Sequence, residues 1–338
     1  MRAWLLHDTT GPEALKLEEV ETPQPGPSQV RVAVKVAGLN HLDLWVSRGM
    51  PAPHDLPHIP GADAAGTIDA IGEGVTGWGV GDEVIVNPSQ SCGHCDACLH
   101  DRMIFCRSYV ILGEHERGTL AEQVVTSAES VVSRPPAIDW PVAGTFGLVS
   151  GTAYRMISRS RLRAGETVLV VGVGGGVSSA AMVIARALGA RVFVTSRSPE
   201  KIAWAVANGA EAGFDSTSEF SKSLKDAAGG ADVVVENVGK ATWDQSLRSL
   251  SPGGRLVVCG ATAGNRVELF LPVLWFKQLE VIGSTMFTRS EFARVLQLVE
   301  SGKVAIPVDR LYPFEELPQA LAHLDAGDQI GKIGLELK

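Results

Sequence analysis

The chain has 338 residues, of which 20% are charged and 45% hydrophobic, a composition typical of globular proteins. Its net charge of −8 and the lack of any basic run argue against a nucleic-acid partner, because phosphate binding requires clustered Lys and Arg. At about 150 residues per domain, this length predicts two domains.

The start of the chain, MRAWLLHDTTGPEAL, contains no apolar stretch long enough for a signal peptide. No segment reaches the roughly 18 consecutive apolar residues of a membrane helix. We therefore expect a cytoplasmic protein with no membrane partner, in which thiols stay reduced. Disulfides are then the weaker interpretation of the cysteines that follow.

Four of the five cysteines lie in residues 91–107 with the spacing C-x2-C-x2-C-x7-C, at Cys92, Cys95, Cys98 and Cys106. Four thiolates at this spacing can close a tetrahedral shell around Zn²⁺. A redox pair is the competing interpretation, but it would need only one C-x-x-C. A closed shell leaves no open position for a substrate, so the predicted zinc is structural, one per chain. A zinc-ribbon nucleic-acid module would share the spacing, but the acidic composition gives it no support.

From about residue 164, short apolar runs alternate with amphipathic stretches. Helical spacing of the apolar residues predicts helices over 176–189 and 198–209. This alternation indicates an α/β domain with a doubly wound parallel sheet. The predicted strands are residues 166–172, 191–196, 231–239, 254–262 and 279–285.

A glycine-rich turn, GVGGGVS at residues 172–178, follows the first of these strands and opens a helix. Glycines there let the backbone approach a pyrophosphate, which then lies at the helix N-terminus. A tight turn without a ligand is the alternative. The position inside a strand–helix–strand unit favours a dinucleotide site. The predicted cofactor-binding residues in the turn are Gly172, Gly174, Gly175, Gly176 and Val177.

The end of the second strand reads TSRSPEK, without the acid that usually binds the ribose hydroxyls of NAD. Ser196 and Arg197 stand there, with Lys201 one helical turn further on. Hydroxyls and cations suit a 2′-phosphate, so NADP is favoured and NAD remains possible. The alternative for Arg197 is a solvated charge beside the helix.

These features together resemble the medium-chain dehydrogenase/reductase superfamily, which includes zinc alcohol dehydrogenases and quinone oxidoreductases. By that resemblance, residues 1–148 and 288–338 form a GroES-like partial β-barrel and residues 149–287 a Rossmann domain, with the active site between them. The segments that carry the likeness are residues 11–49, 57–84, 91–107, 118–125 and 330–337.

The resemblance also locates the family's catalytic zinc ligands. Their positions align with Asn40, Ala62 and Leu148, and the neighbouring glutamate aligns with Asp63. Alanine and leucine side chains cannot bind a metal, and an amide oxygen binds Zn²⁺ poorly. The hydroxyl that usually relays the proton aligns with Leu42. The resemblance therefore implies a structural zinc lobe without a catalytic zinc.

The remaining candidate site residues also follow from the resemblance. Asn40 is expected to donate to a substrate oxygen or to contact a cofactor ribose, unless it only caps the following helix. His41 matches a position that touches the pyrophosphate, and Asp63 is expected to orient Asn40 or His41, or to pair with a structural cation. Thr152 matches a residue packed against the nicotinamide. Lys332 matches a basic residue near the cofactor phosphates; a surface lysine is the alternative.

The hypothesis that follows is an NADPH-dependent oxidoreductase that transfers hydride to a quinone or an α,β-unsaturated carbonyl without a catalytic metal. Two alternatives stay open. One is an alcohol dehydrogenase with unorthodox ligands, and the other is a cofactor-binding protein with little catalysis. The resemblance implies that copies pair across the last strand of the nucleotide-binding sheet in a homodimer or homotetramer, and the apolar run at residues 279–286 suits such an edge strand.

Overall fold

The computed structural model describes residues 1–338 and divides into two compact units. Unit 1 comprises Met1–Leu148, Thr288–Glu300 and Pro307–Lys338, and unit 2 comprises Val149–Phe287 and Ser301–Ile306. The compact units differ from the predicted domains at residues 301–306, which the prediction assigned to the first domain. This segment belongs to unit 2, and its apolar side chains at positions 304 and 306 are buried.

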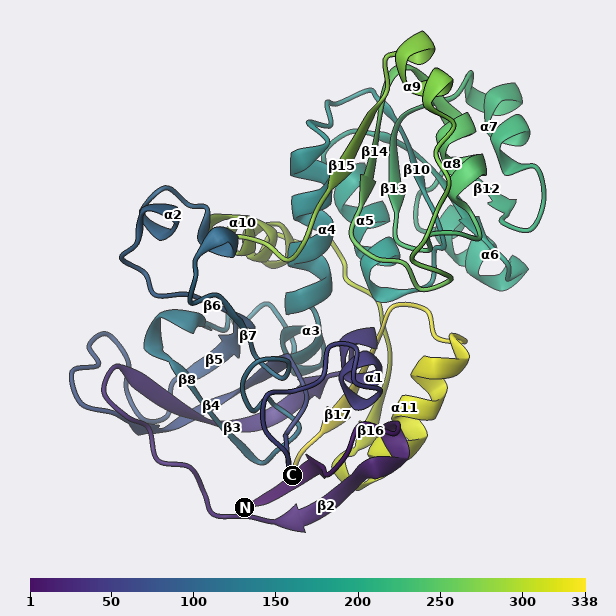
Figure 1. Cartoon of the computed structure of the whole chain (residues 1–338). Coiled ribbons are helices and arrows are strands. Elements are labelled where there is room, and N and C mark those ends of the chain that lie inside the picture. The colour runs from purple at the N-terminus through teal and green to yellow at the C-terminus, as the bar shows by residue number, and fades with distance from the viewer. The chain divides into compact units, whose positions relative to one another are not determined.

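Unit 1 is a curved, mostly antiparallel sheet with short helices around it (Figure 1). Its strands are β1 (Arg2–Leu6), β2 (Leu15–Glu19), β3 (Gln29–Gly38), β4 (Asp63–Ile71), β5 (Glu83–Val86), β6 (Ser89–Gln90), β7 (Val110–Ile111), β8 (Gln123–Ser127), β9 (Val131–Ser133), β16 (Val308–Pro313) and β17 (Lys332–Glu336). Its helices are α1 (His41–Ser47), α2 (Asp96–Leu99), α3 (Trp140–Thr145), α10 (Arg289–Glu300) and α11 (Leu317–Ala326). The main sheet has the strand order β16-β17-β3-β4-β5-β9, and β8 pairs with the other part of β3.

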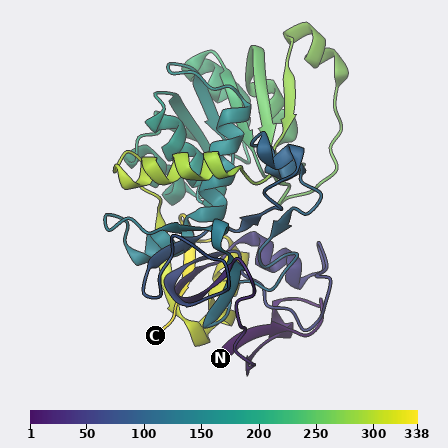
Figure 2. The ribbon, with the colours of Figure 1, turned by 90° about the vertical axis from the view of Figure 1, so that its left-hand side faces the viewer.

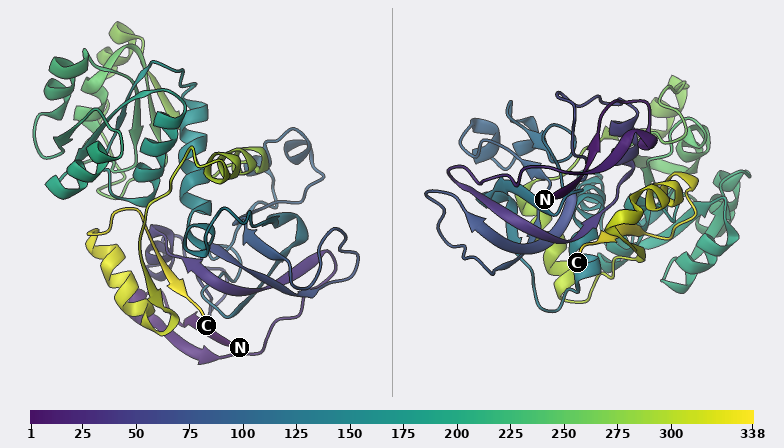
Figure 3. Two further views of the ribbon diagram at one scale, coloured as in Figure 1. Left: turned by 180° about the vertical axis from the view of Figure 1, so that it is seen from behind. Right: turned by 90° about the horizontal axis from the view of Figure 1, so that it is seen from below.

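Strand β3 is the centre of this sheet. Its valines at positions 30, 32, 34 and 36 are all buried, as the period of two in VRVAVKV requires when one face covers a core. Both chain termini lie at the same end of unit 1 (Figures 2 and 3). The return of the chain through β16 and β17 brings its last strand beside β3.

Unit 2 is a six-stranded parallel sheet with helices on both faces, which confirms the predicted α/β class (Figures 1 and 3). Its strands are β10 (Thr167–Val170), β11 (Arg191–Ser196), β12 (Ala212–Asp215), β13 (Ala231–Glu236), β14 (Leu250–Val258) and β15 (Glu280–Gly283). Its helices are α5 (Gly176–Ala187), α6 (Pro199–Ala207), α7 (Phe220–Ala228), α8 (Trp243–Ser249) and α9 (Leu271–Lys277), and α4 (Gly147–Arg159) begins in unit 1. The strand order β12-β11-β10-β13-β14-β15 is that of a doubly wound dinucleotide-binding sheet. No helix in either unit has the length and apolar character needed to cross a membrane.

Candidate active site

Three strand ends meet at one edge of the unit 1 sheet. Strand β3 runs antiparallel to β4 and β17, and its Gly38 lies opposite Asp63 of β4 and Gly334 of β17. The carboxyl end of β3 therefore lies beside the amino ends of the other two strands. This topology brings Asn40, Asp63 and Lys332 together, although they are far apart in the sequence.

Gly38 makes this convergence possible. A Cβ atom there would lie 2.7 Å from Thr145 Cα and 2.9 Å from Asp63 Cβ, closer than real side chains come. The missing side chain lets α3 pack against β3 and leaves room for the Asp63 carboxylate.

The Asn40 side chain is buried, and both the nitrogen and the oxygen of its amide are hydrogen-bonded. Its Nδ2 group donates to Asp63 Oδ2 at 3.0 Å, and its Oδ1 atom accepts from Lys332 Nζ at 2.6 Å. The start of α1 is capped by Asp43, whose Oδ2 atom accepts from the Asn40 backbone N–H at 2.7 Å. The amide of Asn40 is thus part of a polar network.

Asp63 is the acceptor at the centre of this network. Its Oδ1 atom accepts from the backbone N–H of Leu148 at 2.7 Å, and its Oδ2 atom accepts from Asn40 and, at 3.3 Å, from Lys332. Burial raises the pKa of Asp63, and the charge of Lys332 opposes that shift. Asp63 therefore contacts Asn40 and a cation of the chain itself.

Asp43 is a second buried acid that the sequence analysis did not single out. Besides capping α1, it accepts from the backbone N–H of Gly61 at 3.1 Å. Burial raises its pKa to about 7, more than its backbone hydrogen bonds and the charge of Lys332 lower it. The spacing Asn40-x-x-Asp43, a polar residue followed three positions later by an acid, is a capping signal that could have identified it.

Lys332, which was expected near the cofactor phosphates, is the first residue of β17 and is buried among acceptors of unit 1. It is only 2% exposed, and its ammonium donates to Leu39 O, Asn40 Oδ1 and Asp63 Oδ2 at 2.6, 2.6 and 3.3 Å. An ammonium has three hydrogens, so all its donors are used within unit 1. Burial lowers the pKa of Lys332, against the attraction of the two buried acids.

The other positions of the expected metal site carry no ligand. Ala62 is fully buried, and Leu148 offers Asp63 only its backbone N–H. His41 is half-buried at the start of α1, and burial lowers its pKa. Only the cysteine cluster brings three or more His, Cys, Asp or Glu ligands close enough to share a metal ion.

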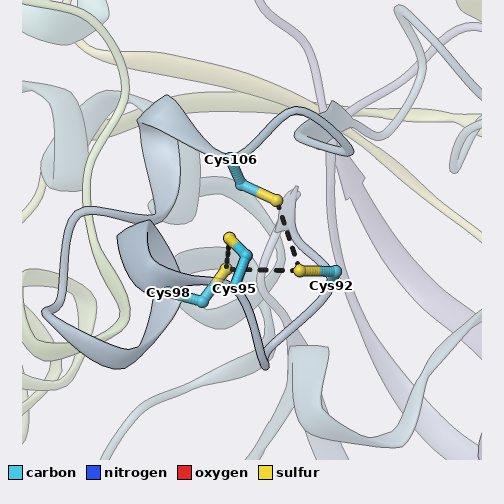
Figure 4. A group of neighbouring side chains, drawn as sticks. All are labelled: Cys92, Cys95, Cys98 and Cys106. Carbon is cyan, nitrogen blue, oxygen red and sulfur yellow. Dashed lines mark hydrogen bonds between the residues drawn. The ribbon is translucent and has the colours of Figure 1, made fainter.

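The four cysteines form that cluster, with their sulfur atoms within 4.8 Å of one another (Figure 4). Cys92 Sγ lies 3.8 Å from Cys98 Sγ and 3.6 Å from Cys106 Sγ, and Cys95 Sγ lies 3.5 Å from Cys98 Sγ. Zn–S bonds of about 2.3 Å in a tetrahedron place sulfurs about 3.8 Å apart. The cluster therefore fits a structural Zn²⁺.

The cysteine lobe is tied to the start of α10, which lies beside it in the views of Figures 1 and 2. Asp101 accepts hydrogen bonds from the hydroxyls of Thr288 and Ser290, and Arg289 forms an ion pair with Glu129 at 2.7 Å. The contacts of Asp101 join the lobe (residues 91–107) to a helix that follows it by nearly two hundred residues, and the Arg289–Glu129 pair joins the same helix to the segment before β9.

The glycine-rich turn in unit 2 fits a bound pyrophosphate. Gly172 and Gly174 have φ angles of 74° and 112°, and a Cβ at Gly174 would lie 2.4 Å from Lys201 Cδ. No side chain caps the N-terminus of α5, and no atom lies within 4 Å of a Cβ placed at Gly175. The backbone N–H groups of Gly176 and Val177, which have no acceptor within α5, are therefore open to an anion.

The residues expected to contact the rest of the cofactor also lie in unit 2. Ser196 ends β11 as a buried residue, whereas Arg197 is exposed and no carboxylate pairs with it. The Lys201 stem lies over Gly174 of the turn. Thr152 is buried on α4, and its hydroxyl has no hydrogen-bond partner, as expected of an atom that meets a ligand.

Two further residues of this site were missed. Asn237 donates through Nδ2 to Ser178 Oγ at 3.0 Å, which joins the end of β13 to the start of α5. The buried carboxylate of Glu236 accepts from the backbone N–H groups at 238 and 239 and from two hydroxyls, and so shapes the turn after β13. The signal was a charged residue at the end of the apolar run ADVVVE.

Comparisons with known proteins identify relatives that span both units. A model described as an alcohol dehydrogenase GroES-like domain matches residues 26–136, and one described as a zinc-binding dehydrogenase matches residues 176–301.

An acryloyl-coenzyme A reductase of Metallosphaera sedula is 32% identical over 95% of this chain and 96% of its own. A quinone oxidoreductase of Rattus norvegicus is 32% identical over 99% of this chain and 96% of its own. A solved structure of a NAD-dependent alcohol dehydrogenase is 37% identical, with a TM-score of 0.97 over 100% of both chains. The names of these relatives state different substrates.

Proposed function

The chain belongs to the medium-chain dehydrogenase/reductase superfamily and is an NAD(P)H-dependent oxidoreductase, and from this premise we propose that it reduces conjugated carbonyl compounds without a catalytic metal. The proposed substrates are α,β-unsaturated carbonyls or quinones, and the proposed cofactor is NADPH. The observation that carries the proposal is the buried network of Asn40, Asp63 and Lys332. It lies where the resemblance places the ligands of a reactive zinc, and Ala62 and Leu148 supply no ligand there.

The chemistry of the reaction explains why such a site suits conjugated substrates. Reducing a simple aldehyde or ketone places negative charge directly on one oxygen, which zinc stabilises as a Lewis acid. A conjugated carbonyl or a quinone spreads that charge through its π-system, so hydrogen bonds suffice. Bound NADPH supplies the hydride. The chain supplies a buried amide donor, since Asp63 uses only one of the two Nδ2 hydrogens of Asn40.

The names of the relatives support this substrate class without choosing within it. One is an acryloyl-coenzyme A reductase and another a quinone oxidoreductase. The solved structure of a NAD-dependent alcohol dehydrogenase favours alcohol oxidation as the second candidate. That reaction would require a second metal ion, and Asn40, Ala62 and Leu148 offer it at most one weak ligand.

A paired assay separates these functions. Reduction of an enone or quinone with NADPH is compared with oxidation of ethanol or benzyl alcohol with NADP⁺, and zinc is counted per chain. We expect the conjugated carbonyl to react at least about 10²-fold faster, the cost of losing one strong oxyanion contact. One zinc per chain should be found. Faster alcohol oxidation that disappears with a second zinc would establish the alcohol dehydrogenase instead. A protein that binds NADPH but turns over neither class would be a cofactor-binding relative.

We also propose a preference for NADPH, based on Ser196, the exposed Arg197 and Lys201 around the end of β11. An Arg–phosphate contact contributes about 1.5–3 kcal/mol. Arg197→Ala should therefore weaken NADPH binding about ten- to a hundredfold in calorimetric titrations and barely change NADH binding. Arg191→Ala, at the other end of β11 in an exposed ion pair with Glu211, is the matched control. Equal affinities of the unmodified protein for both cofactors would contradict the proposal.

The exposed apolar face of α9 and β15 supports pairing with a second copy. Phe270, Trp275 and Phe276 are 75%, 58% and 82% exposed, and Val281 of the edge strand is 41% exposed. An apolar edge strand left open would promote aggregation. Light scattering should give a dimer, or a tetramer built from it, of the 35.7 kDa chain. Phe276→Asp should lower that mass, and a monomeric mass for the unmodified protein would contradict the prediction.

A further inference from the structure

The ammonium group of Lys332 is buried in unit 1, and all of its hydrogen-bond donors have acceptors there. Its three ammonium hydrogens meet three acceptors, one backbone carbonyl, one amide oxygen and one carboxylate oxygen. The residue begins β17, whose register against β3 directs it to the end of that strand. A lysine that binds a cofactor phosphate would need at least one free donor.

The place of this ammonium matters because its partners align with the family's metal site. Asn40 stands at a ligand position and Asp63 at the neighbouring acid, and both contact Lys332. Asp43 and His41 are the other titratable groups that interact electrostatically with it. A single positive charge thus faces two buried acids where a metal ion would otherwise stand.

The two charged partners allow the Asn40 amide only one orientation. In the structure Oδ1 faces the ammonium and Nδ2 faces the carboxylate. A flipped amide would turn its N–H donors toward Lys332, which has only donors, and its oxygen toward Asp63, which accepts when ionised. Both contacts would become repulsive, so Lys332 and Asp63 together fix the donor group of Asn40.

We propose that Lys332 is the resident cation of this site, a positioning residue that neutralises Asp63 and fixes the Asn40 amide, and that it does not bind the cofactor phosphates. The consequence for the reaction rests on the proposed function, in which Asn40 donates to the oxygen that gains charge. The chain's own ammonium then supplies the fixed positive charge that the metal-dependent relatives take from zinc.

The first test separates turnover from cofactor affinity. Lys332→Met should lower kcat for an enone at saturating NADPH at least about tenfold, because a misaligned oxyanion donor loses much of its effect. Its dissociation constant for NADPH should stay within about twofold of the unmodified value. Lys201→Met, at the glycine-rich turn, is the contrasting control and should mainly weaken NADPH binding. A tenfold weaker NADPH affinity of Lys332→Met with unchanged kcat would overturn the proposal.

A double-mutant cycle tests the coupling between the two side chains. If Lys332 acts through Asn40, the variant with both Asn40→Ala and Lys332→Met should turn over no more slowly than Asn40→Ala alone. Additive losses would overturn the positioning role. Where Lys332→Met leaves Asp63 uncompensated and fails to fold, Lys332→Met with Asp63→Asn removes both charges. That double variant then replaces Lys332→Met in the kinetic and binding measurements and in the double-mutant cycle.

An NMR measurement decides the orientation without any activity. The chain has five asparagines, so selective ¹⁵N-asparagine labelling resolves their side chains, and Asn40→Ala identifies the signal of interest. In the unmodified protein the Asn40 amide protons should exchange slowly with water. Lys332→Met, or its charge-neutral partner, should speed that exchange at least about tenfold, because the amide is then free to rotate. Unchanged exchange would overturn the proposal, even if no conjugated carbonyl is reduced and the proposed function itself fails.

Discussion

Replacing Cys95 by serine is expected to release the zinc and unfold the lobe over residues 91–107. Structural zinc contributes on the order of 10 kcal/mol to the folding of small zinc domains, and three thiolates no longer close its shell. Zinc should fall well below one per chain by metal analysis, and thermal unfolding should begin at a lower temperature. NADPH binding should remain, because the glycine-rich turn belongs to unit 2.

Cys259→Ser is the matched control for this experiment. Cys259 follows β14 in unit 2 and belongs to no cluster of metal ligands. Its replacement should leave the zinc content unchanged. If Cys95→Ser keeps a full zinc ion, or if carefully purified unmodified protein contains none, the cluster does not have the role assigned to it. The contacts of Asp101 with Thr288 and Ser290 further predict faster hydrogen exchange at the start of α10 in Cys95→Ser.

The second large effect is expected from Asp63→Ala. The substitution leaves the buried ammonium of Lys332 without its carboxylate and two N–H donors, of Asn40 and Leu148, without an acceptor. Breaking a buried ion pair by removing one partner costs about 3–5 kcal/mol. Urea denaturation followed by circular dichroism should show that loss in the free energy of unfolding.

Asp69→Ala, on the same strand β4, provides the comparison for Asp63→Ala. Asp69 pairs with Arg31 at 2.8 Å, but its side chain is 30% exposed. A partly exposed pair of this kind contributes about 0–1 kcal/mol, because water and salt screen it. Equal losses in the free energy of unfolding would contradict this prediction. They would mean that the buried Asp63–Lys332 pair contributes no more to stability than the partly exposed pair.

Much of the fold could be predicted because its signals are local. The strands of unit 2 are short apolar runs, and Ser198 at the N-cap and Pro199 at the first helical position mark the start of α6. In unit 1 the alternating valines of β3 identify a strand with one buried face, but they do not state which strands lie beside it. That order required the resemblance to a known family.

The cysteine cluster and the glycine-rich turn were predictable for the same reason. All four thiolates lie within fifteen residues, and the turn contains its own glycines, so spacing alone indicates the chemistry. The buried acids at 43 and 236 were missed because their burial depends on strands and helices that pack over them. The only sequence signals for these acids were a capping pattern at position 43 and, at position 236, a charged residue at the end of an apolar run.

The sequence by itself determined the α/β class of unit 2, the cysteine cluster and the glycine-rich turn, and the resemblance added the positions of Ala62 and Leu148, whose side chains cannot bind a metal. Only the tertiary structure decided what Asn40, Asp63 and Lys332 do together. Lys332 and Asn40 are 292 positions apart, and they meet because β17 returns to pair with β3 beside β4. A motif match assigns a lysine to a phosphate by its position, whereas burial and the number of available acceptors determine where its charge is stabilised.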